Sequence, residues 1–183
     1  MPVNAPNDIL ETLAPPFNLK NINGDMISLK NAKGTNGTVI VFICNHCPYV
    51  KAIAKRLKKD ADDLSKQGIN TIAIMSNDVI SYPEDSFDNM KIFSEKHKFN
   101  FPYLFDETQE IAKQYQAVCT PDFFGFDKNL KLKYRGRLDS GVMNSDKYEK
   151  VERDLYNAMI KIKNDGIGPN NQMNSIGCSI KWI

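Results

Sequence analysis

The stretch TVIVFICNHCPYV, residues 38–50, places a hydrophobic segment, two cysteines and the start of a helix in direct succession. Its first part, TVIVFI, is apolar or β-branched without interruption, which is typical of a strand covered on both faces. From Val50 to Leu64, apolar side chains recur every three or four residues and charged side chains take the other face, as in an amphipathic helix. Gly68 ends this helix, and Ile69–Ser76 predicts a second buried strand.

Further elements follow along the chain from the same kind of pattern. In order, the sequence predicts a helix from Ser81 to His97, a strand at Tyr103–Phe105, a short helix at Glu110–Tyr115, a hairpin of Phe123–Phe126 and Leu130–Tyr134, and a last helix from Tyr148 to Ile162. The stretch after Asp165 is rich in Gly and Asn, which predicts an irregular C-terminal tail. This alternation indicates an α/β fold with a central mixed β-sheet flanked by helices, in a single domain over residues 1–183.

The composition is that of an ordinary globular protein. Of the 183 residues, 42% are hydrophobic and 25% are charged, and 24 basic residues against 22 acidic ones give a net charge of +2. A charge so close to zero provides no general attraction for nucleic acid or anionic membranes, so neither is an expected partner. The first residues lack a secretory signal, and no segment reaches the roughly 18 apolar residues of a membrane span. We therefore expect a cytoplasmic protein, where closely spaced cysteines are more often catalytic or metal-binding than structural.

Cys44 and Cys47 form a C-x-x-C motif at the predicted start of the helix. Unpaired N–H groups and the helix dipole stabilise a thiolate at that position, and the thiolate is the reactive form of cysteine. A protonated His46 would add a positive charge beside it, and Pro48 suits the first turn of a helix. We predict that Cys44 is the exposed, attacking thiol and that Cys47 is the more buried, resolving thiol.

Other interpretations of these residues stay open at this point. The cysteine pair could be buried and inert, or could bind zinc, but a closed zinc site needs four ligands and no second C-x-x-C or H-x-H is present. We accordingly expect no metal and no cofactor. His46 could be a plain surface residue. Cys119 is most simply a small buried thiol, and Cys178 could resolve an oxidised Cys44, pair with another chain or have no role.

Three segments together resemble a known family: FICNHCPYV (42–50), VCTPDFFGFD (118–127) and GCSIKW (177–182). They are similar to the thioredoxin-fold proteins, specifically the peroxiredoxin-like, redoxin-type branch of the alkyl hydroperoxide reductase/thiol-specific antioxidant (AhpC/TSA) superfamily. The segments APPFNL and YPEDS also resemble that branch. The resemblance implies a thioredoxin-like fold with an N-terminal extension. It also implies a cis peptide bond between Thr120 and Pro121, packed beside Cys44 in a loop that offers its backbone to a partner segment.

The sequence departs from both related groups. Typical peroxiredoxins carry a threonine and a proline ahead of the reactive cysteine and an arginine beside it, whereas the residues before Cys44 are apolar back to Thr38. Thioredoxins keep a buried acid in the strand before the cysteines, and TVIVFI contains none, which leaves the proton acceptor unassigned. Arg135 and Arg137, in the segment YRGR, are interpreted as exposed charges at the end of a strand, although one of them could face an anionic substrate.

These residues favour an enzyme, a thiol-disulfide oxidoreductase in which the Cys44 thiolate attacks a disulfide and Cys47 resolves the mixed disulfide. The alternative is a thiol peroxidase, in which a hydroperoxide oxidises Cys44 or Cys47 to a sulfenic acid that the neighbouring thiol traps. A second alternative is a redox-responsive binding module with little turnover. The two enzymes require protein or small-molecule disulfides, or hydroperoxides, as substrates and a thiol electron donor that the sequence does not identify.

Overall fold

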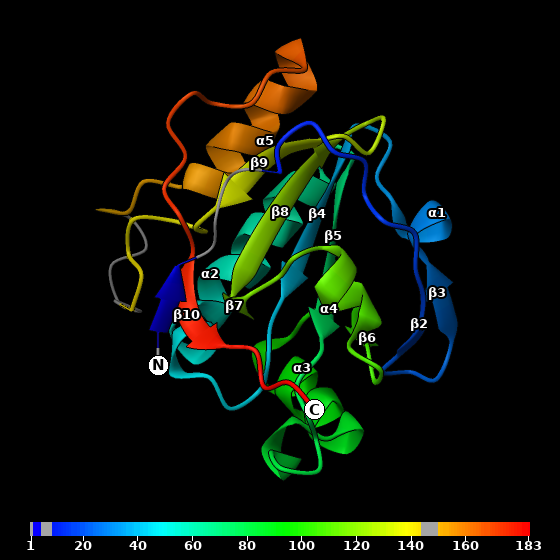
Figure 1. Cartoon of the computed structure of the whole chain (residues 1–183). Coiled ribbons are helices and arrows are strands. Elements are labelled where there is room, and N and C mark those ends of the chain that lie inside the picture. The colour runs from blue at the N-terminus through cyan, green and yellow to red at the C-terminus, as the bar shows by residue number, and fades with distance from the viewer. Residues whose placement is uncertain (1, 5–8, 144–149) are drawn as a thin grey trace.

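The computed structural model describes residues 2–4, 9–143 and 150–183. Its centre is a seven-stranded sheet in the order β3-β2-β6-β5-β4-β8-β9 (Figure 1). The strands of this sheet are β2 (Asn18–Asn21), β3 (Met26–Ser28), β4 (Gly37–Phe42), β5 (Ile69–Met75), β6 (Tyr103–Phe105), β8 (Asp122–Asp127) and β9 (Leu132–Gly136). β5 pairs in parallel with β4 and β6, whereas the other pairs are antiparallel. The central sheet is therefore mixed, as predicted.

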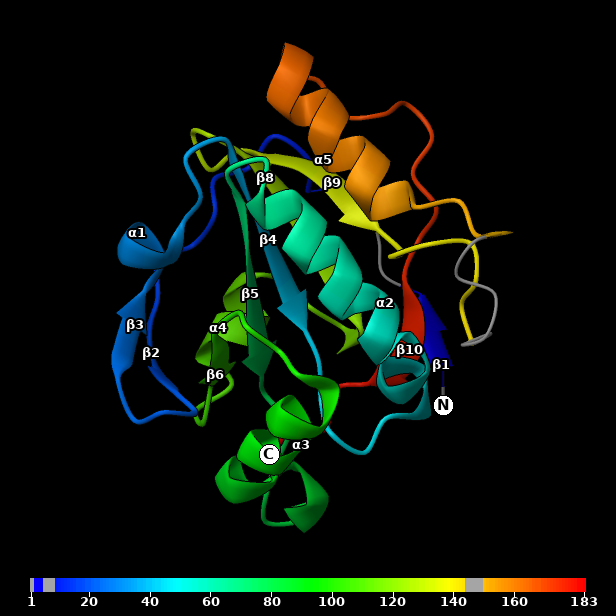
Figure 2. The ribbon, with the colours of Figure 1, turned by 180° about the vertical axis from the view of Figure 1, so that it is seen from behind.

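Helices cover both faces of the sheet. They are α1 (Leu29–Ala32), α2 (Pro48–Ser65), α3 (Phe87–His97), α4 (Glu110–Gln114) and α5 (Asp154–Asp165), with a 3-10 turn, η1, at Pro83–Asp85. Figure 2 shows α2 in front of the sheet, and Figure 1, from the other side, shows α4 in front of it. Along β4, Val39 and Val41 pack in the core under α2, α3 and α5, while Ile40 and Phe42 pack in the core under α4. Because both faces are covered, β4 needs apolar residues at every position.

A second, small sheet lies beside the start of α2. It consists of β1 (Pro2–Asn4), β10 (Ile176–Ser179) and β7 (Cys119–Thr120), with β10 in the middle and both pairs antiparallel. The prediction of an irregular tail after Asp165 is therefore wrong for Ile176–Ser179. This strand forms through pairing with segments from the other end and the middle of the chain, so a local sequence pattern does not reveal it.

Two helix predictions are also corrected. The helix expected from Ser81 to His97 is divided, because the Ser86 hydroxyl accepts a hydrogen bond from Asn89 N–H and begins α3 after the η1 turn. The last helix begins at Asp154. The preceding Glu152 lies in a loop, where its backbone carbonyl oxygen accepts a hydrogen bond from Ser140 N–H of another loop. Tyr148, the expected start, lies outside the described residues. Across the described ranges, no helix is long and apolar enough to cross a lipid bilayer.

The expectation that Arg135 is exposed is wrong. Its side chain is 0% exposed, and its Nη2 donates to Asp122 Oδ2 at 3.0 Å and to the Gln116 carbonyl oxygen at 2.7 Å. β9 is an edge strand of the sheet, but the Gln172 side chain covers that edge, because its Oε1 accepts a hydrogen bond from the backbone N–H of Arg135. Arg137 is half-buried and pairs with Asp154 at 2.6 Å.

A buried ion pair joins α2 to the segment after β9. Arg56 Nε lies 2.6 Å from Asp139 Oδ2, and the two side chains are 1% and 2% exposed. We expect Arg56→Ala to lower the free energy of unfolding by about 3–5 kcal/mol, because it leaves a buried carboxylate without its partner. Lys59→Ala, which breaks a surface pair with Asp63, is the control and should cost less than about 1 kcal/mol. Urea unfolding measures both, and equal losses would contradict the expectation.

Candidate active site

The cysteine motif and the Thr-Pro segment meet where β4, α2 and β7 come together. Cys44 is separated from the end of β4 by Ile43, Cys47 is the N-cap residue of α2, and Pro48 is the first residue of that helix. Thr120 ends β7, and its peptide bond to Pro121 is cis, as the resemblance implied. The fold therefore assembles the predicted site residues from two segments far apart in the chain.

Cys47 has the environment of a stabilised thiolate. When it ionises, the thiols of Cys44 and Cys178 and the backbone amides of Val50 and Cys178 act as donors to its sulfur. These interactions outweigh burial and lower the pKa of Cys47 to about 4, with the Cys44 thiol contributing most. When protonated, the same sulfur donates to the Thr120 carbonyl oxygen at 3.2 Å. Of the two thiols, Cys47 is therefore the one whose pKa is shifted toward the thiolate form.

Cys44 keeps its proton. Donation to the Cys47 thiolate, burial and the negative charge of Asp85 together raise the pKa of Cys44 above its ordinary value. Its sulfur lies 3.3 Å from Thr120 Oγ1 and 3.9 Å from His46 Nδ1. The prediction that Cys44 is exposed is wrong, since Cys44 and Cys47 are both 0% exposed. The reason is that Cys44 continues from β4, a strand with neighbours on both sides, directly into the core.

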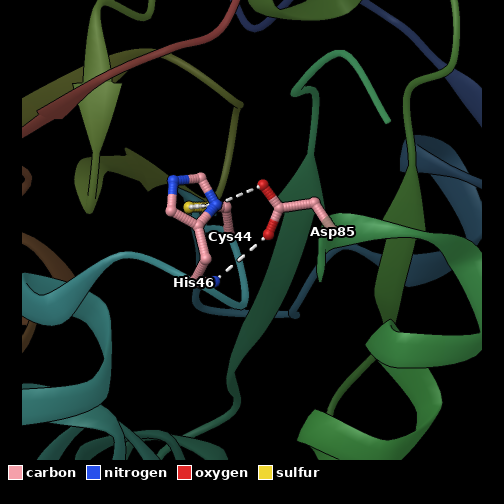
Figure 3. A group of neighbouring side chains, drawn as sticks. All are labelled: Cys44, His46 and Asp85. Carbon is pink, nitrogen blue, oxygen red and sulfur yellow. Dashed lines mark hydrogen bonds and ion pairs between the residues drawn. The ribbon is translucent and has the colours of Figure 1, made fainter. Parts of the chain in front are cut away.

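His46 lies between Cys44 and the buried carboxylate of Asp85 (Figure 3). Its Nδ1 is 2.7 Å from Asp85 Oδ2, and its backbone N–H donates to Oδ1 at 3.2 Å. Oδ1 also accepts from Asn45 N–H at 2.8 Å, and Oδ2 accepts from Asn77 Nδ2 at 2.8 Å. These donors offset the free-energy cost of burying the Asp85 carboxylate, which is 0% exposed. Because an ionised carboxylate only accepts, the proton of the contact belongs to His46 Nδ1.

Asp85 is the site residue that sequence reasoning missed. It lies in η1, 39 residues after His46, in the segment YPEDS, which was noted only for its resemblance to the family. Thioredoxins place a buried acid in the strand before the cysteines, whereas the buried acid beside His46 comes from a separate turn, η1. The Tyr82 ring, stacked on His46 with centroids 5.5 Å apart, helps to hold the imidazole in place. No local pattern marks an aspartate whose burial depends on such distant donors.

Cys44, His46 and Asp85 could also be considered as ligands for a metal, since their ligand atoms all lie within 4.8 Å of one another. Each Asp85 oxygen, however, already accepts from two donors, and His46 Nδ1 faces Asp85 rather than an open position. A structural zinc site would also need a fourth ligand. The geometry fits a hydrogen-bonded Cys-His-Asp group better than a metal centre, and the absence of a metal stays a prediction.

The other two cysteines occupy neighbouring strands of the small sheet. Cys119 on β7 is buried, donates to the Pro121 carbonyl oxygen at 3.5 Å, and has its pKa raised chiefly by that burial. Cys178 on β10 is half-buried and lies opposite Thr120. Partial burial and the neighbouring Cys47 sulfur raise the pKa of Cys178 to about 11. The fold therefore places Cys178 beside the reactive pair.

Comparison with known proteins places the chain among thiol enzymes. A sequence profile of the AhpC/TSA family matches residues 10–135. Peroxiredoxin Bcp of Escherichia coli (strain K12) is 26% identical over 113 residues, which is 62% of this chain and 67% of the relative.

Two solved structures show the fold. An uncharacterized conserved protein from Geobacillus kaustophilus has a TM-score of 0.92 and 44% sequence identity, over 100% of this chain and 97% of that one. The thioredoxin domain of a thiol-disulfide oxidoreductase from Bacteroides vulgatus has a TM-score of 0.65 and 18% identity, over 85% of this chain and 98% of that one. These likenesses confirm the thioredoxin-like fold that the resemblance implied. The chain belongs to the AhpC/TSA family, as a thiol-dependent oxidoreductase of the redoxin type.

Proposed function

We propose that the chain catalyses thiol-disulfide exchange through Cys47 and Cys44, with Cys47 as the attacking thiolate. One observation carries this proposal: two adjacent thiols lie at the N-terminus of α2 beside the cis Thr120–Pro121 bond, and Cys47, the N-cap residue, is the one whose pKa is lowered. A dithiol enzyme needs this arrangement, since the thiolate attacks and the protonated thiol resolves. The order is the reverse of the one expected from the sequence, in which Cys44 attacks.

In the reductive direction, the Cys47 thiolate attacks one sulfur of a substrate disulfide. A bond forms between Cys47 and that sulfur, the substrate disulfide breaks, and its second sulfur leaves as a thiolate. Cys44 then attacks Cys47, which forms the Cys44–Cys47 disulfide and releases the remaining substrate sulfur, and the Cys44 proton passes to a departing thiolate. Two electrons reach the substrate, and an external dithiol restores the reduced pair.

Thr120 supports the resolving step, with His46 and Asp85 beside it. As Cys44 loses its proton, Thr120 Oγ1 at 3.3 Å can donate to its sulfur, whereas His46 Nδ1, at 3.9 Å, already donates its proton to Asp85. The Thr120 hydroxyl favours the developing thiolate, because hydrogen bonds to a charged acceptor are stronger than neutral ones. Asp85 acts as a positioning residue, since it fixes the orientation of the imidazole and the proton on Nδ1.

A thiol peroxidase is the second candidate, and the 26% identity to peroxiredoxin Bcp favours it. In that reaction the Cys47 thiolate attacks a peroxide oxygen, the O–O bond breaks, and Cys47 becomes a sulfenic acid while water or an alcohol leaves. Cys44 then displaces water to form the same disulfide. Typical peroxiredoxins use an arginine beside the reactive cysteine, but the charge of the buried Arg135 is already compensated by Asp122. Disulfide exchange is therefore the preferred function, and peroxide reduction is the second candidate.

Rapid-mixing kinetics tests which of the two reactions the protein catalyses. The reduced protein is mixed with a small aromatic disulfide and, separately, with hydrogen peroxide. Fast disulfide exchange that consumes the Cys44 and Cys47 thiols, with slow reaction toward peroxide, supports the proposal. Faster consumption of peroxide would make the chain a peroxidase instead. Loss of thiols in neither reaction would favour a redox-responsive binding module.

The Cys47 thiolate has a pH dependence that can be measured. Because the pKa of Cys47 is lowered to about 4, the ultraviolet absorbance of the thiolate should persist at neutral pH and fall only as the pH drops through about 4. The same shift affects stability. A lowered pKa stabilises the folded, reduced protein, and this stabilisation is fully present above the ordinary cysteine pKa of about 8.5. It is lost as the pH falls through the pKa of Cys47 in the folded protein, about 4. Cys47→Ser should remove the signal, and a wild-type midpoint near the ordinary value would contradict the assignment.

A further inference from the structure

Three thiols, rather than two, meet at the cysteine site. In the small sheet, β10 brings Cys178 opposite Thr120, and Cys47 Sγ lies 3.2 Å from the carbonyl oxygen of the same Thr120. When Cys47 is ionised, the thiols of Cys44 and Cys178 both donate to its sulfur. Cys47 therefore has a possible disulfide partner on each of two separate segments.

The close approach of β10 depends on Gly177. A Cβ at this position would collide with the carbonyl oxygen of Thr120, so glycine is required for the strand to lie directly against the Thr120–Pro121 bond. On its other side β10 pairs with β1, whose Pro2 lies opposite Cys178. Figure 1 shows β10 between β1 and β7, and β10 also packs against α2. Two strands and a helix thus hold Cys178 at the site.

We propose that Cys178 is a third redox-active thiol, which takes over the disulfide from the Cys44–Cys47 pair and passes it to an external thiol donor. This inference rests on the proposed exchange function and adds the route by which electrons reach the pair. Cys44 and Cys47 are 0% exposed, whereas Cys178 is half-buried. A bulky donor, such as a small protein with a reactive dithiol, can therefore approach Cys178 more readily than either sulfur of the pair.

The transfer is an intramolecular disulfide exchange. The Cys178 thiolate attacks Cys47 Sγ, a Cys47–Cys178 bond forms, the Cys44–Cys47 bond breaks, and Cys44 leaves as a thiolate that takes up the proton released by Cys178. A donor thiol then attacks Cys178 and frees Cys47 as a thiolate. The second donor thiol displaces Cys178 and leaves as the donor disulfide, so a dithiol donor supplies both electrons.

The charge on Cys47 also controls Cys178. In the reduced protein, the neighbouring Cys47 sulfur is one of the causes that raise the pKa of Cys178 to about 11. Once Cys47 is part of a disulfide it carries no charge, whereas Lys181 continues to lower the pKa of Cys178. Oxidation of the pair therefore increases the fraction of Cys178 that is ionised at the stage where its attack is needed.

Disulfide mapping in Cys44→Ser protein tests this inference. The variant retains Cys47, Cys119 and Cys178, and after mild oxidation with diamide, peptide mass spectrometry should find Cys47 linked to Cys178 within one chain. A further Cys119→Ala change should leave that link intact, because Cys119 is buried and bonded to Pro121. A further Cys178→Ser change should abolish it.

A rate measurement on the full chain provides a second test that does not depend on the Cys44→Ser variant. The oxidised wild-type and Cys178→Ser proteins are reduced either by a thioredoxin or by a small phosphine. We expect Cys178→Ser to slow reduction by the thioredoxin by roughly tenfold or more and to leave reduction by the phosphine unchanged, since a small reductant does not need the exposed thiol.

The outcomes separate this inference from the proposed function. If Cys178→Ser protein forms the Cys44–Cys47 disulfide, but Cys44→Ser protein never links Cys47 to Cys178 and the thioredoxin rate is unchanged, the role of Cys178 is refuted and the exchange function stands. If neither disulfide forms on oxidation, the exchange function itself is refuted.

Discussion

Replacement of Cys47 by serine is expected to lower the rates of disulfide exchange and of any peroxide reduction by at least about a thousandfold. Cys47 is the group whose pKa is lowered to about 4, by donation from Cys44, Cys178 and the Val50 amide. A serine hydroxyl stays protonated at neutral pH and forms no disulfide, so the first step of either reaction is lost. Stopped-flow kinetics of the reduced variant with a small disulfide measures the effect.

The matched control for this prediction removes the two resolving thiols. In Cys44→Ser/Cys178→Ser protein, Cys47 keeps the Val50 amide beside it and should still form an adduct with the substrate, which then accumulates because no neighbouring thiol displaces it. Mass spectrometry after a single turnover should locate this adduct on Cys47. An adduct on Cys44 in Cys47→Ser protein, formed at the wild-type rate, would instead show that Cys44 attacks first, as the sequence indicated.

The second large effect is expected at Asp85. Its replacement by alanine leaves the backbone N–H groups of Asn45 and His46, the His46 ring and the Asn77 amide without their common acceptor. The loss of a buried carboxylate with this many donors is expected to lower the free energy of unfolding by about 3–5 kcal/mol. Urea unfolding of the reduced protein measures this loss, and a change below about 1 kcal/mol would contradict the described network.

Asp85→Asn separates the packing of Asp85 from its effect on the reaction. The amide keeps the shape of the side chain, but one acceptor oxygen becomes a donor, so His46 loses the partner that fixes its proton on Nδ1. Because the negative charge of Asp85 raises the pKa of Cys44, its removal should lower that pKa and speed the resolution of the Cys47 adduct by up to about tenfold at neutral pH, while the first attack changes little. Glu84→Gln, at an exposed position of η1, is the control. Equal resolving rates in the two variants across the pH range would give Asp85 a structural role only.

The parts of the fold that depend on neighbours along the chain are those that the sequence predicts. The uninterrupted apolar run of β4 reflects its central position, and the spacing of apolar residues from Val50 to Leu64 reflects the one buried face of α2. The prediction of a helix that starts at the cysteine turn is confirmed, with Pro48 as its first residue. The segments FICNHCPYV, VCTPDFFGFD and GCSIKW together carried the resemblance to the family.

Residues that act across long distances behave differently. Arg135 occupies an edge strand and was expected at the surface, but Asp122 compensates its charge in the interior. Asp85 reaches His46 from a separate turn, and Cys178 reaches Cys47 because β10 pairs with β7 beside Thr120. None of these contacts has a periodic signal in the sequence, because each joins segments that only the completed fold brings together.

The sequence by itself determined the class of chemistry, since a C-x-x-C turn between a buried strand and an amphipathic helix places thiols at a helix N-terminus. Only the tertiary structure decided the direction in which the pKa of each thiol shifts, because a pKa depends on the donors, charges and burial around the group. Those surroundings lower the pKa of Cys47 and raise that of Cys44, and they place Asp85 and Cys178 at the site. The spacing of residues along the chain does not predict these surroundings.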